Sequence, residues 1–312
     1  MNRPYLAAFA LASLLLVTAT PGDAGIRDRI RERMAKRFSE QIKEDQTTGG
    51  RVMAYGKDPL QTLAFWGPAA QSARPTTPAP LILFVHGGAW KHGDRDNATG
   101  EAKVAHFPAQ GYAFASINYR LVPAATVEEQ AADVAAALAY VRAHATELNI
   151  DPARIVLMGH SAGAHLVALV GTDPRYLAAA GLDQSALAGV VPIDGAAYDV
   201  PAQMQAGARF MGETYEQAFG KEPTRQRAIS PTLQAAAPNA PAFLILHVQR
   251  KDGIEQARGL ADALRKAGTS VQIDSFEGRG LQGHMDINRK LGLPDYPATA
   301  VVDRWLKQRF GA

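Results

Sequence analysis

The chain has 312 residues, of which 47% are hydrophobic and 20% charged, and its formal net charge at pH 7 is +3. These values are ordinary for a soluble globular protein, and the charge is too small to indicate a nucleic-acid partner. The sequence contains no cysteine. That excludes disulfides, a thiolate nucleophile and a cysteine-ligated metal site.

Residues 1–24 have the three parts of a secretory signal peptide. Arg3 supplies a positive charge, residues 5–17 form a short apolar core, and Gly22-Asp23-Ala24 offers small residues for cleavage before Gly25. The apolar core is too short to favour a membrane-spanning helix. The pattern predicts export to the periplasm or the medium, with an uncleaved membrane anchor as the alternative.

Residues 25–47 form a separate N-terminal segment with an amphipathic helix pattern. Apolar side chains recur every four residues among charged ones, at Ile26, Ile30, Met34, Phe38 and Ile42. We interpret this segment as a helix that docks on the main domain. The alternative is an interfacial helix that binds a membrane or shields the active site, so any membrane contact is expected only through residues 26–44.

The main domain is predicted to span residues 48–312. Its first motif that points to a function follows a strand that begins at residue 81. A proline-rich loop at 70–80 precedes a buried strand at 81–85, which ends in His86-Gly87-Gly88-Ala89-Trp90. Consecutive glycines after a strand let backbone N–H groups approach a ligand without an intervening Cβ. Such donors are needed where a reaction develops negative charge on oxygen.

The most informative motif is Gly159-His160-Ser161-Ala162-Gly163. It follows a β-branched apolar run at 154–158 and precedes a helix-compatible run at 164–170. A serine on a tight strand-to-helix turn is held clear of the sheet, and the N–H of the next residue points at the reacting carbonyl. We therefore predict that Ser161 is a nucleophile and that the N–H groups of Gly87, Gly88 and Ala162 form an oxyanion hole.

These motifs resemble those of the α/β-hydrolase superfamily. Within it the chain is similar to the hormone-sensitive-lipase-like esterases and to the neighbouring kynurenine formamidases and feruloyl/acetylxylan esterases. The resemblance covers roughly residues 50–310 and rests on three further segments besides the elbow: the HGGxW form of 86–90, Ser116–Leu121 followed by Pro123, and Asn149–Ile155. It implies an α/β fold with a mostly parallel, doubly wound sheet and helices on both faces.

About 48 residues separate the strand that ends near Ile193 from the apolar strand at 242–248. This connection is long, so residues 194–241 are predicted to form a small cap-like insertion before the penultimate strand. In the resembled enzymes this region lines the substrate pocket. We accordingly expect Trp90, Tyr198 and Phe210 to line it here, although packing within the insertion is the plainer reading for any one of its aromatic residues.

The superfamily order of catalytic residues is serine, acid, histidine. Beyond the helix after Ser161 the chain has two histidines, His247 and His284. His284 is predicted to be the base because it lies in a glycine-rich loop, whereas His247 ends a strand. Asp252 is predicted to be the acid, since the resembled enzymes carry it in the loop after the strand at 242–248. The rival acids are Asp194, Glu255 and Asp274.

The sequence thus predicts an exported serine carboxylesterase for small-molecule esters, acting through an acyl-enzyme intermediate. Neither a metal nor a cofactor is expected. An arylformamidase with the same catalytic residues is the alternative, although the export signal counts against it. A non-catalytic binding protein with the hydrolase fold is the third hypothesis.

Overall fold

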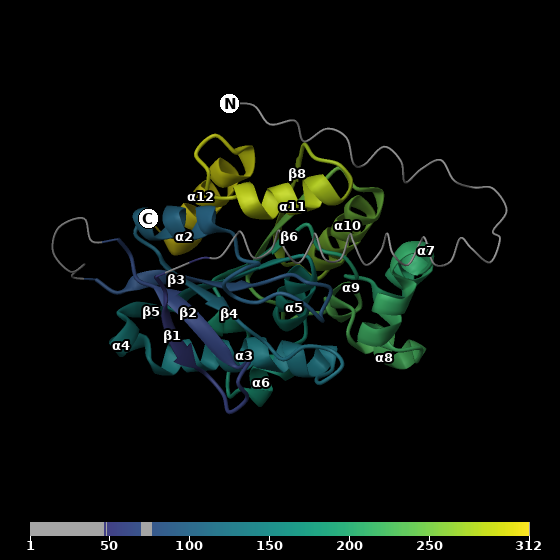
Figure 1. The fold of residues 1–312 in the computed structure, drawn as a ribbon, viewed down its shortest axis with the longest axis horizontal. Coiled ribbons are helices and arrows are strands. Elements are labelled where there is room, and N and C mark those ends of the chain that lie inside the picture. The colour runs from purple at the N-terminus through teal and green to yellow at the C-terminus, as the bar shows by residue number, and fades with distance from the viewer. Residues whose placement is uncertain (1–46, 48, 70–76, 312) are drawn as a thin grey trace, which may run out of the picture. The chain divides into compact units, whose positions relative to one another are not determined.

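The computed structural model describes residue 47 and residues 49–69 and 77–311 (Figure 1). The chain divides into two units, Met1–Glu44 and Asp45–Ala312, and the described residues all belong to the second. The predicted signal peptide at 1–24 lies outside the described residues. So does the predicted amphipathic segment at 25–47, apart from Thr47.

Eight strands form a single sheet in the order β1-β2-β4-β3-β5-β6-β7-β8. β2 pairs antiparallel with both β1 and β4, and the other neighbouring pairs are parallel. The strands are β1 Arg51–Ala54, β2 Thr62–Trp66, β3 Ala79–Val85, β4 Ala113–Ile117, β5 Ile150–His160, β6 Gly189–Ile193, β7 Ala242–Val248 and β8 Ser270–Phe276.

Helices connect the parallel strands and cover both faces of the sheet (Figure 1). They are α2 Glu101–Ala109, α3 Val127–Ala143, α4 Ala145–Leu148, α5 Ala162–Thr172, α6 Pro174–Ala179, η1 Gln184–Ala186, α7 Val200–Phe219, α8 Pro223–Ala228, α9 Pro231–Gln234, α10 Lys251–Lys266, α11 Gly280–Lys290 and α12 Pro297–Phe310. Local sequence sets several of their ends. At the start of α3, for example, Thr126 and Glu129 form a reciprocal capping box.

The alternation of side chains along each strand divides the core into two layers. Every residue of β3 is buried; Ile82 and Phe84 face a cluster that includes side chains of α2, α11 and α12. Leu81, Leu83 and Val85 face the opposite cluster, which includes side chains of α3, α5 and α10. Burial on both faces explains why the central strands read as continuous apolar runs. The predicted fold class is thereby confirmed. The segment between β6 and β7, where an insertion was predicted, contains the helices α7, α8 and α9.

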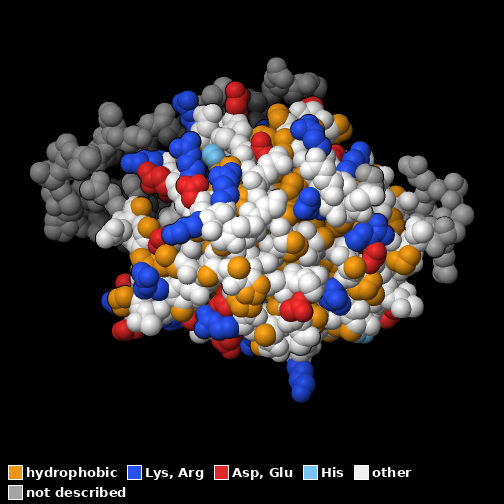
Figure 2. Space-filling model, turned by 180° about the vertical axis from the view of Figure 1, so that it is seen from behind, with side chains coloured by type: hydrophobic (Ala, Val, Ile, Leu, Met, Phe, Trp, Pro, Cys, Tyr) orange, Lys and Arg blue, Asp and Glu red, His pale blue; other side chains and the backbone are white. Residues whose placement is uncertain are grey.

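Surface side chains of both charge signs are interspersed with apolar ones on the face shown in Figure 2, in keeping with the small net charge. Within the described part of the chain, no helix combines the length and apolar character that a membrane span requires.

Lys103 of α2 is a fully buried lysine that packs against α11. Its Nζ donates hydrogen bonds to the carbonyls of Thr99, at 2.6 Å, and Asn288, and lies 5.1 Å from the ring centroid of Phe84. Burial lowers the pKa of Lys103 to about 7 from 10.5. Between these values the unfolded chain binds more protons, so folding stability should rise with pH, by up to about 1.4 kcal/mol per unit.

We therefore expect the free energy of unfolding of the native chain to rise between pH 7 and pH 10 relative to a Lys103→Met variant. Urea titrations of both proteins across this range would measure the difference. Parallel curves for the two proteins would contradict the prediction.

Candidate active site

Ser161 lies at the apex of a strained turn between β5 and α5. Its backbone angles are φ 57° and ψ −116°, a left-handed region that few side chains adopt. The turn closes because β5 and α5 touch backbone to backbone: a Cβ on Gly159 would lie 2.4 Å from the carbonyl oxygen of Gly163. The Ser161 N–H donates to the carbonyl of Ile193 at 3.0 Å, which anchors the turn to β6.

Gly163 also brings α5 against the end of β3, because a Cβ there would lie 2.1 Å from the Val85 carbonyl oxygen. Gly163→Ala should therefore lower the free energy of unfolding by about 1–3 kcal/mol or more. Gly259→Ala in α10 is the matched control, since no atom lies within 4 Å of its added Cβ. It should raise stability by about 0.5–1 kcal/mol. Chemical denaturation of both variants would measure this contrast, and an equal effect of the two would refute it.

The loop after β3 lies directly beside the serine. A Cβ on Gly87 would come within 3.0 Å of the Ser161 Cβ, and one on Gly88, whose φ is +133°, would lie 1.9 Å from the carbonyl oxygen of His92. His86 anchors the start of this loop to Tyr119. The two rings stack with centroids 4.4 Å apart, and the Tyr119 hydroxyl donates to the backbone carbonyl of His86. The structure therefore places Gly87 beside Ser161, whose successor Ala162 is the first residue of α5.

His284 joins the serine to a buried carboxylate. Its Nε2 lies 2.9 Å from Ser161 Oγ, and its Nδ1 lies 2.6 Å from Asp194 Oδ2. A carboxylate can only accept, so Nδ1 carries the proton and Nε2 is left to accept from the serine hydroxyl. This is the tautomer that a general base acting on Ser161 requires.

The acid beside His284 is Asp194, which corrects the prediction of Asp252. Helix α10 begins at Lys251, so Asp252 sits in a first helical turn and not in a loop, and its carboxylate contacts Arg250 at 3.2 Å. Asp194 directly follows β6, the neighbour of the strand that carries Ser161. Glu255 and Asp274 also lie away from this contact, on α10 and within β8. His284 itself lies in α11 and not in the expected loop.

Asp194 is fully buried, and three further hydrogen bonds hold its carboxylate and its backbone N–H. Its Oδ1 accepts from the Val248 N–H at 3.1 Å, its Oδ2 accepts from Arg250 Nε at 2.9 Å, and its own N–H donates to Leu246. Burial alone would raise the pKa of Asp194. The hydrogen bond and charge of His284, the charge of Arg250 and the Val248 N–H outweigh burial and hold the pKa well below its usual range. Asp194 is therefore an anion that stabilises a protonated His284.

His160, which sequence reasoning did not select, lies against His284. Its Nε2 donates to the His284 carbonyl at 2.9 Å, and the two rings lie 4.5 Å apart. Burial, followed by the charge of His284, holds the pKa of His160 well below its usual range, so the ring is neutral. The only sequence signal for this role is its position, directly before the serine at the end of β5.

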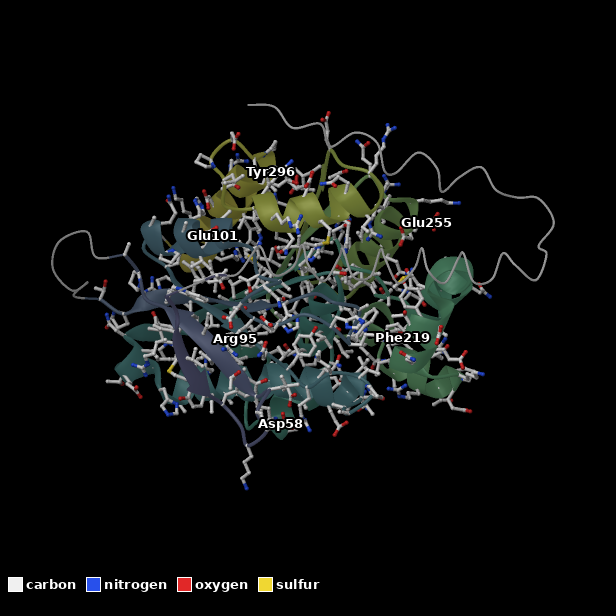
Figure 3. The ribbon with its side chains drawn as sticks, in the orientation of Figure 1. Asp58, Arg95, Glu101, Phe219, Glu255 and Tyr296 are labelled. Atoms are coloured by element: carbon white, nitrogen blue, oxygen red, sulfur yellow. The ribbon has the colours of Figure 1, made fainter. Side chains whose placement is uncertain are left out.

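The residues predicted to line a substrate pocket are placed differently. Trp90 and Tyr198 are 2% and 0% exposed and belong to the apolar core. Trp90 packs edge-on against Phe219 at 4.6 Å and donates from Nε1 to His165; Phe219 lies at the end of α7 (Figure 3). The pocket prediction is corrected for these two residues, because large aromatic side chains gain most from full burial. The side chain of Phe210 lies outside the described residues.

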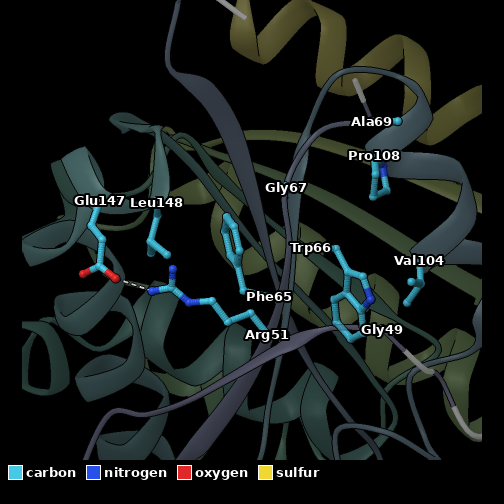
Figure 4. Close-up of a pocket in the computed structure, with 10 residues that line it drawn as sticks. All are labelled: Gly49, Arg51, Phe65, Trp66, Gly67, Ala69, Val104, Pro108, Glu147 and Leu148. Atoms are coloured by element: carbon cyan, nitrogen blue, oxygen red, sulfur yellow. Dashed lines mark hydrogen bonds and ion pairs between the residues drawn. The ribbon is translucent and has the colours of Figure 1, made fainter. Parts of the chain in front are cut away.

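A cavity of about 450 Å³ lies at the antiparallel edge of the sheet and not at Ser161 (Figure 4). Arg51 of β1 and Glu147 of α4 form an ion pair at its rim, and Phe65 and Trp66 of β2 contribute aromatic walls. None of its lining residues belongs to the hydrogen-bonded group around Ser161. In the described part of the chain, no cluster of three or more His, Cys, Asp or Glu side chains is arranged to hold a metal ion.

Comparison with known proteins identifies the family. The BD-FAE family profile matches residues 70–264, which include Ser161, Asp194 and both glycines of the loop after β3. The chain belongs to the BD-FAE family. The α/β-hydrolase resemblance predicted from the motifs is thereby confirmed.

Relatives of this BD-FAE protein include named esterases. It is 36% identical over 231 residues to esterase LipC of Mycobacterium tuberculosis, a match that covers 70% of this chain and 56% of LipC. It therefore spans about half the length of that relative. It is 24% identical over 269 residues to kynurenine formamidase of Drosophila melanogaster, covering 84% of this chain and 83% of that protein.

The BD-FAE protein is also similar to solved esterase structures. The propionate-bound structure of esterase 2 from Thermogutta terrifontis aligns with a TM-score of 0.66 at 26% identity, covering 83% of this chain and 94% of that one. The fold of residues that surround Ser161 is thus one found in esterases.

Proposed function

We propose that this protein is a serine carboxylesterase that hydrolyses small carboxylic esters. The observation that carries the proposal is the continuous hydrogen-bonded series from Ser161 Oγ through His284 to Asp194. The esterase relatives support the same reaction class. An already assembled base and acid beside a strained serine argue against a purely binding role.

In the proposed reaction, Ser161 Oγ attacks the acyl carbon while His284 Nε2 takes its proton. The N–H groups of Gly87, Gly88 and Ala162 stabilise the oxyanion that forms. Asp194 stabilises the imidazolium, which then protonates the departing alcohol. Water, deprotonated by the same histidine, attacks the acyl-enzyme and releases the acid and Ser161.

The experiment that tests the proposal combines active-site labelling with a substrate panel. A fluorophosphonate probe should modify Ser161, located by peptide mass spectrometry. The unlabelled protein should hydrolyse p-nitrophenyl esters from acetyl to decanoyl, and the labelled protein should not. A protein that takes up no label and hydrolyses none of these esters would refute the proposal.

Arylformamidase activity is the second candidate, favoured by the match to kynurenine formamidase over most of the chain. The same serine, histidine and oxyanion donors would act on a formamide C–N bond. Parallel kcat/KM values for p-nitrophenyl acetate and N-formylkynurenine separate the two reactions. A higher value for the formamide would assign this activity instead.

Export through residues 1–24 stays a prediction from the sequence. Protein recovered from a bacterial host with its own export machinery should begin at Gly25 by intact-mass analysis. A membrane fraction that retains Met1 would indicate an uncleaved anchor instead.

A further inference from the structure

Arg250 lies between two carboxylates, only one of which touches His284. Its Nε donates to Asp194 Oδ2 at 2.9 Å, and its Nη2 lies 3.4 Å from the Asp194 carbonyl oxygen. On the other side its Nη1 lies 3.2 Å from Asp252 Oδ2. The charges therefore alternate in a row, with the imidazole of His284 at one end and the carboxylate of Asp252 at the other.

The fold builds this row into the start of α10. Arg250 is the residue before the helix, two positions after β7, and its side chain is only 16% exposed. Gly253 leaves room for the pair: a Cβ there would lie 3.2 Å from Arg250 Nη2 and 3.3 Å from Asp194 Oδ1. Burial disfavours the charged guanidinium, but the charges of Asp194 and Asp252 outweigh it and raise the pKa of Arg250.

The three charges of this row together set the net charge that acts on the imidazole of His284. Asp194 alone would place one negative charge next to the imidazole, and Arg250 cancels much of it. Asp252 in turn cancels much of the charge of Arg250, although its side chain is 35% exposed and so partly screened. The net electrostatic effect on His284 is then close to that of a single negative charge. Arg250 also holds the Asp194 carboxylate in place.

We propose that Arg250 and Asp252 are positioning residues that act through Asp194 and set the pH at which His284 loses its proton and becomes an active base. The inference rests on the proposed function, because it assigns these residues to the same site. It gives Asp252 a role different from the acid that the sequence predicted. It also predicts opposite effects from removing the two charges.

The imidazole, Asp194 and Arg250 are also surrounded by ionisable groups that are left unchanged in the test. Four of these groups interact with the three directly, and they are His160 at the end of β5, Tyr198 before α7, Tyr215 of α7 and Tyr296 before α12. Lys103 of α2 interacts with His160, and Asp286 of α11 with Tyr296. Their contribution is common to all the variants compared. It therefore cancels when the variants are compared with the native chain.

The experiment compares the acid limb of the kcat/KM profile for p-nitrophenyl acetate in the native chain and in two variants. Neutral His284 is the active form, so a change that favours the imidazolium moves the limb to higher pH. Arg250→Gln removes a cation and should move the midpoint up by about 0.5–1 pH unit. Asp252→Asn removes an anion and should move it down by about 0.2–0.5 pH unit. KM should change little in either variant.

Asp262→Asn is the matched control, because Asp262 is an anion of the same helix whose side chain is 77% exposed and pairs with Arg265. It should leave the limb in place. Asp252→Glu keeps the charge and should restore the native midpoint. Shifts of the same sign for Arg250→Gln and Asp252→Asn, or an Asp252→Asn shift no larger than that of Asp262→Asn, would overturn the proposal.

Two further measurements separate this proposal from its premises. The titration midpoint of the His284 ring, followed by NMR with ¹³C-labelled histidine, should shift as the limb does and needs no substrate, so it holds even if the proposed reaction is wrong. If Arg250→Gln fails to fold, the comparison of the Asp252→Asn shift with the Asp262→Asn shift tests the proposal by itself. Where Arg250→Gln folds, adding Asp252→Asn should produce a smaller shift than in the native background; an unchanged shift would mean that Asp252 does not act through Arg250.

Discussion

Replacing Ser161 by alanine should lower kcat for p-nitrophenyl acetate by about 10⁶, leaving only the residual rate that binding and the oxyanion donors supply. The reason is that the variant keeps His284 and the oxyanion donors but has no oxygen from which to form an acyl-enzyme. The alanine must still adopt the turn with φ near 57°, so a small loss of thermal stability is expected. Steady-state kinetics and thermal melting would measure the two effects.

The control for this change is Ser185→Ala, which removes the hydroxyl of an exposed serine bonded only locally to Asp183. It should leave kcat unaltered. Ser161→Ala enzyme that keeps more than a few per cent of native turnover while folded would exclude Ser161 as the nucleophile.

Asp194→Asn should lower kcat by about 10⁴ and leave KM nearly unchanged. An asparagine amide can donate to Nδ1 of His284, which places the ring proton on Nε2, where it can no longer accept from Ser161. The change also leaves Arg250 without its buried anionic partner, so some loss of stability accompanies it. Kinetics at the pH optimum, with a melting curve for each preparation, would measure both.

Asp252→Asn is the comparison variant that shows which of the two aspartates acts on His284. Asp252 contacts Arg250 and not His284, so its loss should cost less than about tenfold in kcat at the optimum. If Asp252→Asn were the crippling change and Asp194→Asn remained active, the acid would be the residue after β7, and the hydrogen bond between Asp194 and His284 would have no catalytic role.

The sequence by itself determined the fold class and pointed to Ser161 as the nucleophile we propose. Both follow from local patterns: apolar strand runs that need burial on both faces, and glycines at 159 and 163 where two backbones meet. The loop after β3 was also predicted from a local pattern, two consecutive glycines after a strand. The structure places Gly87 where a Cβ would come within 3.0 Å of the Ser161 Cβ. His284 followed from its order in the chain.

Only the tertiary structure decided which acid meets the histidine. In the sequence Asp194 and Asp252 each follow an apolar strand, and nothing local distinguishes them. The sheet order places β6 directly beside β5, with Ile193 opposite His160, so Asp194 emerges next to Ser161. Asp252 emerges one strand farther away, in a helical turn that directs it to Arg250. Such a contact depends on the order of strands that are far apart in the chain. The burial of Trp90 and Tyr198 likewise depends on neighbours that are distant in the chain.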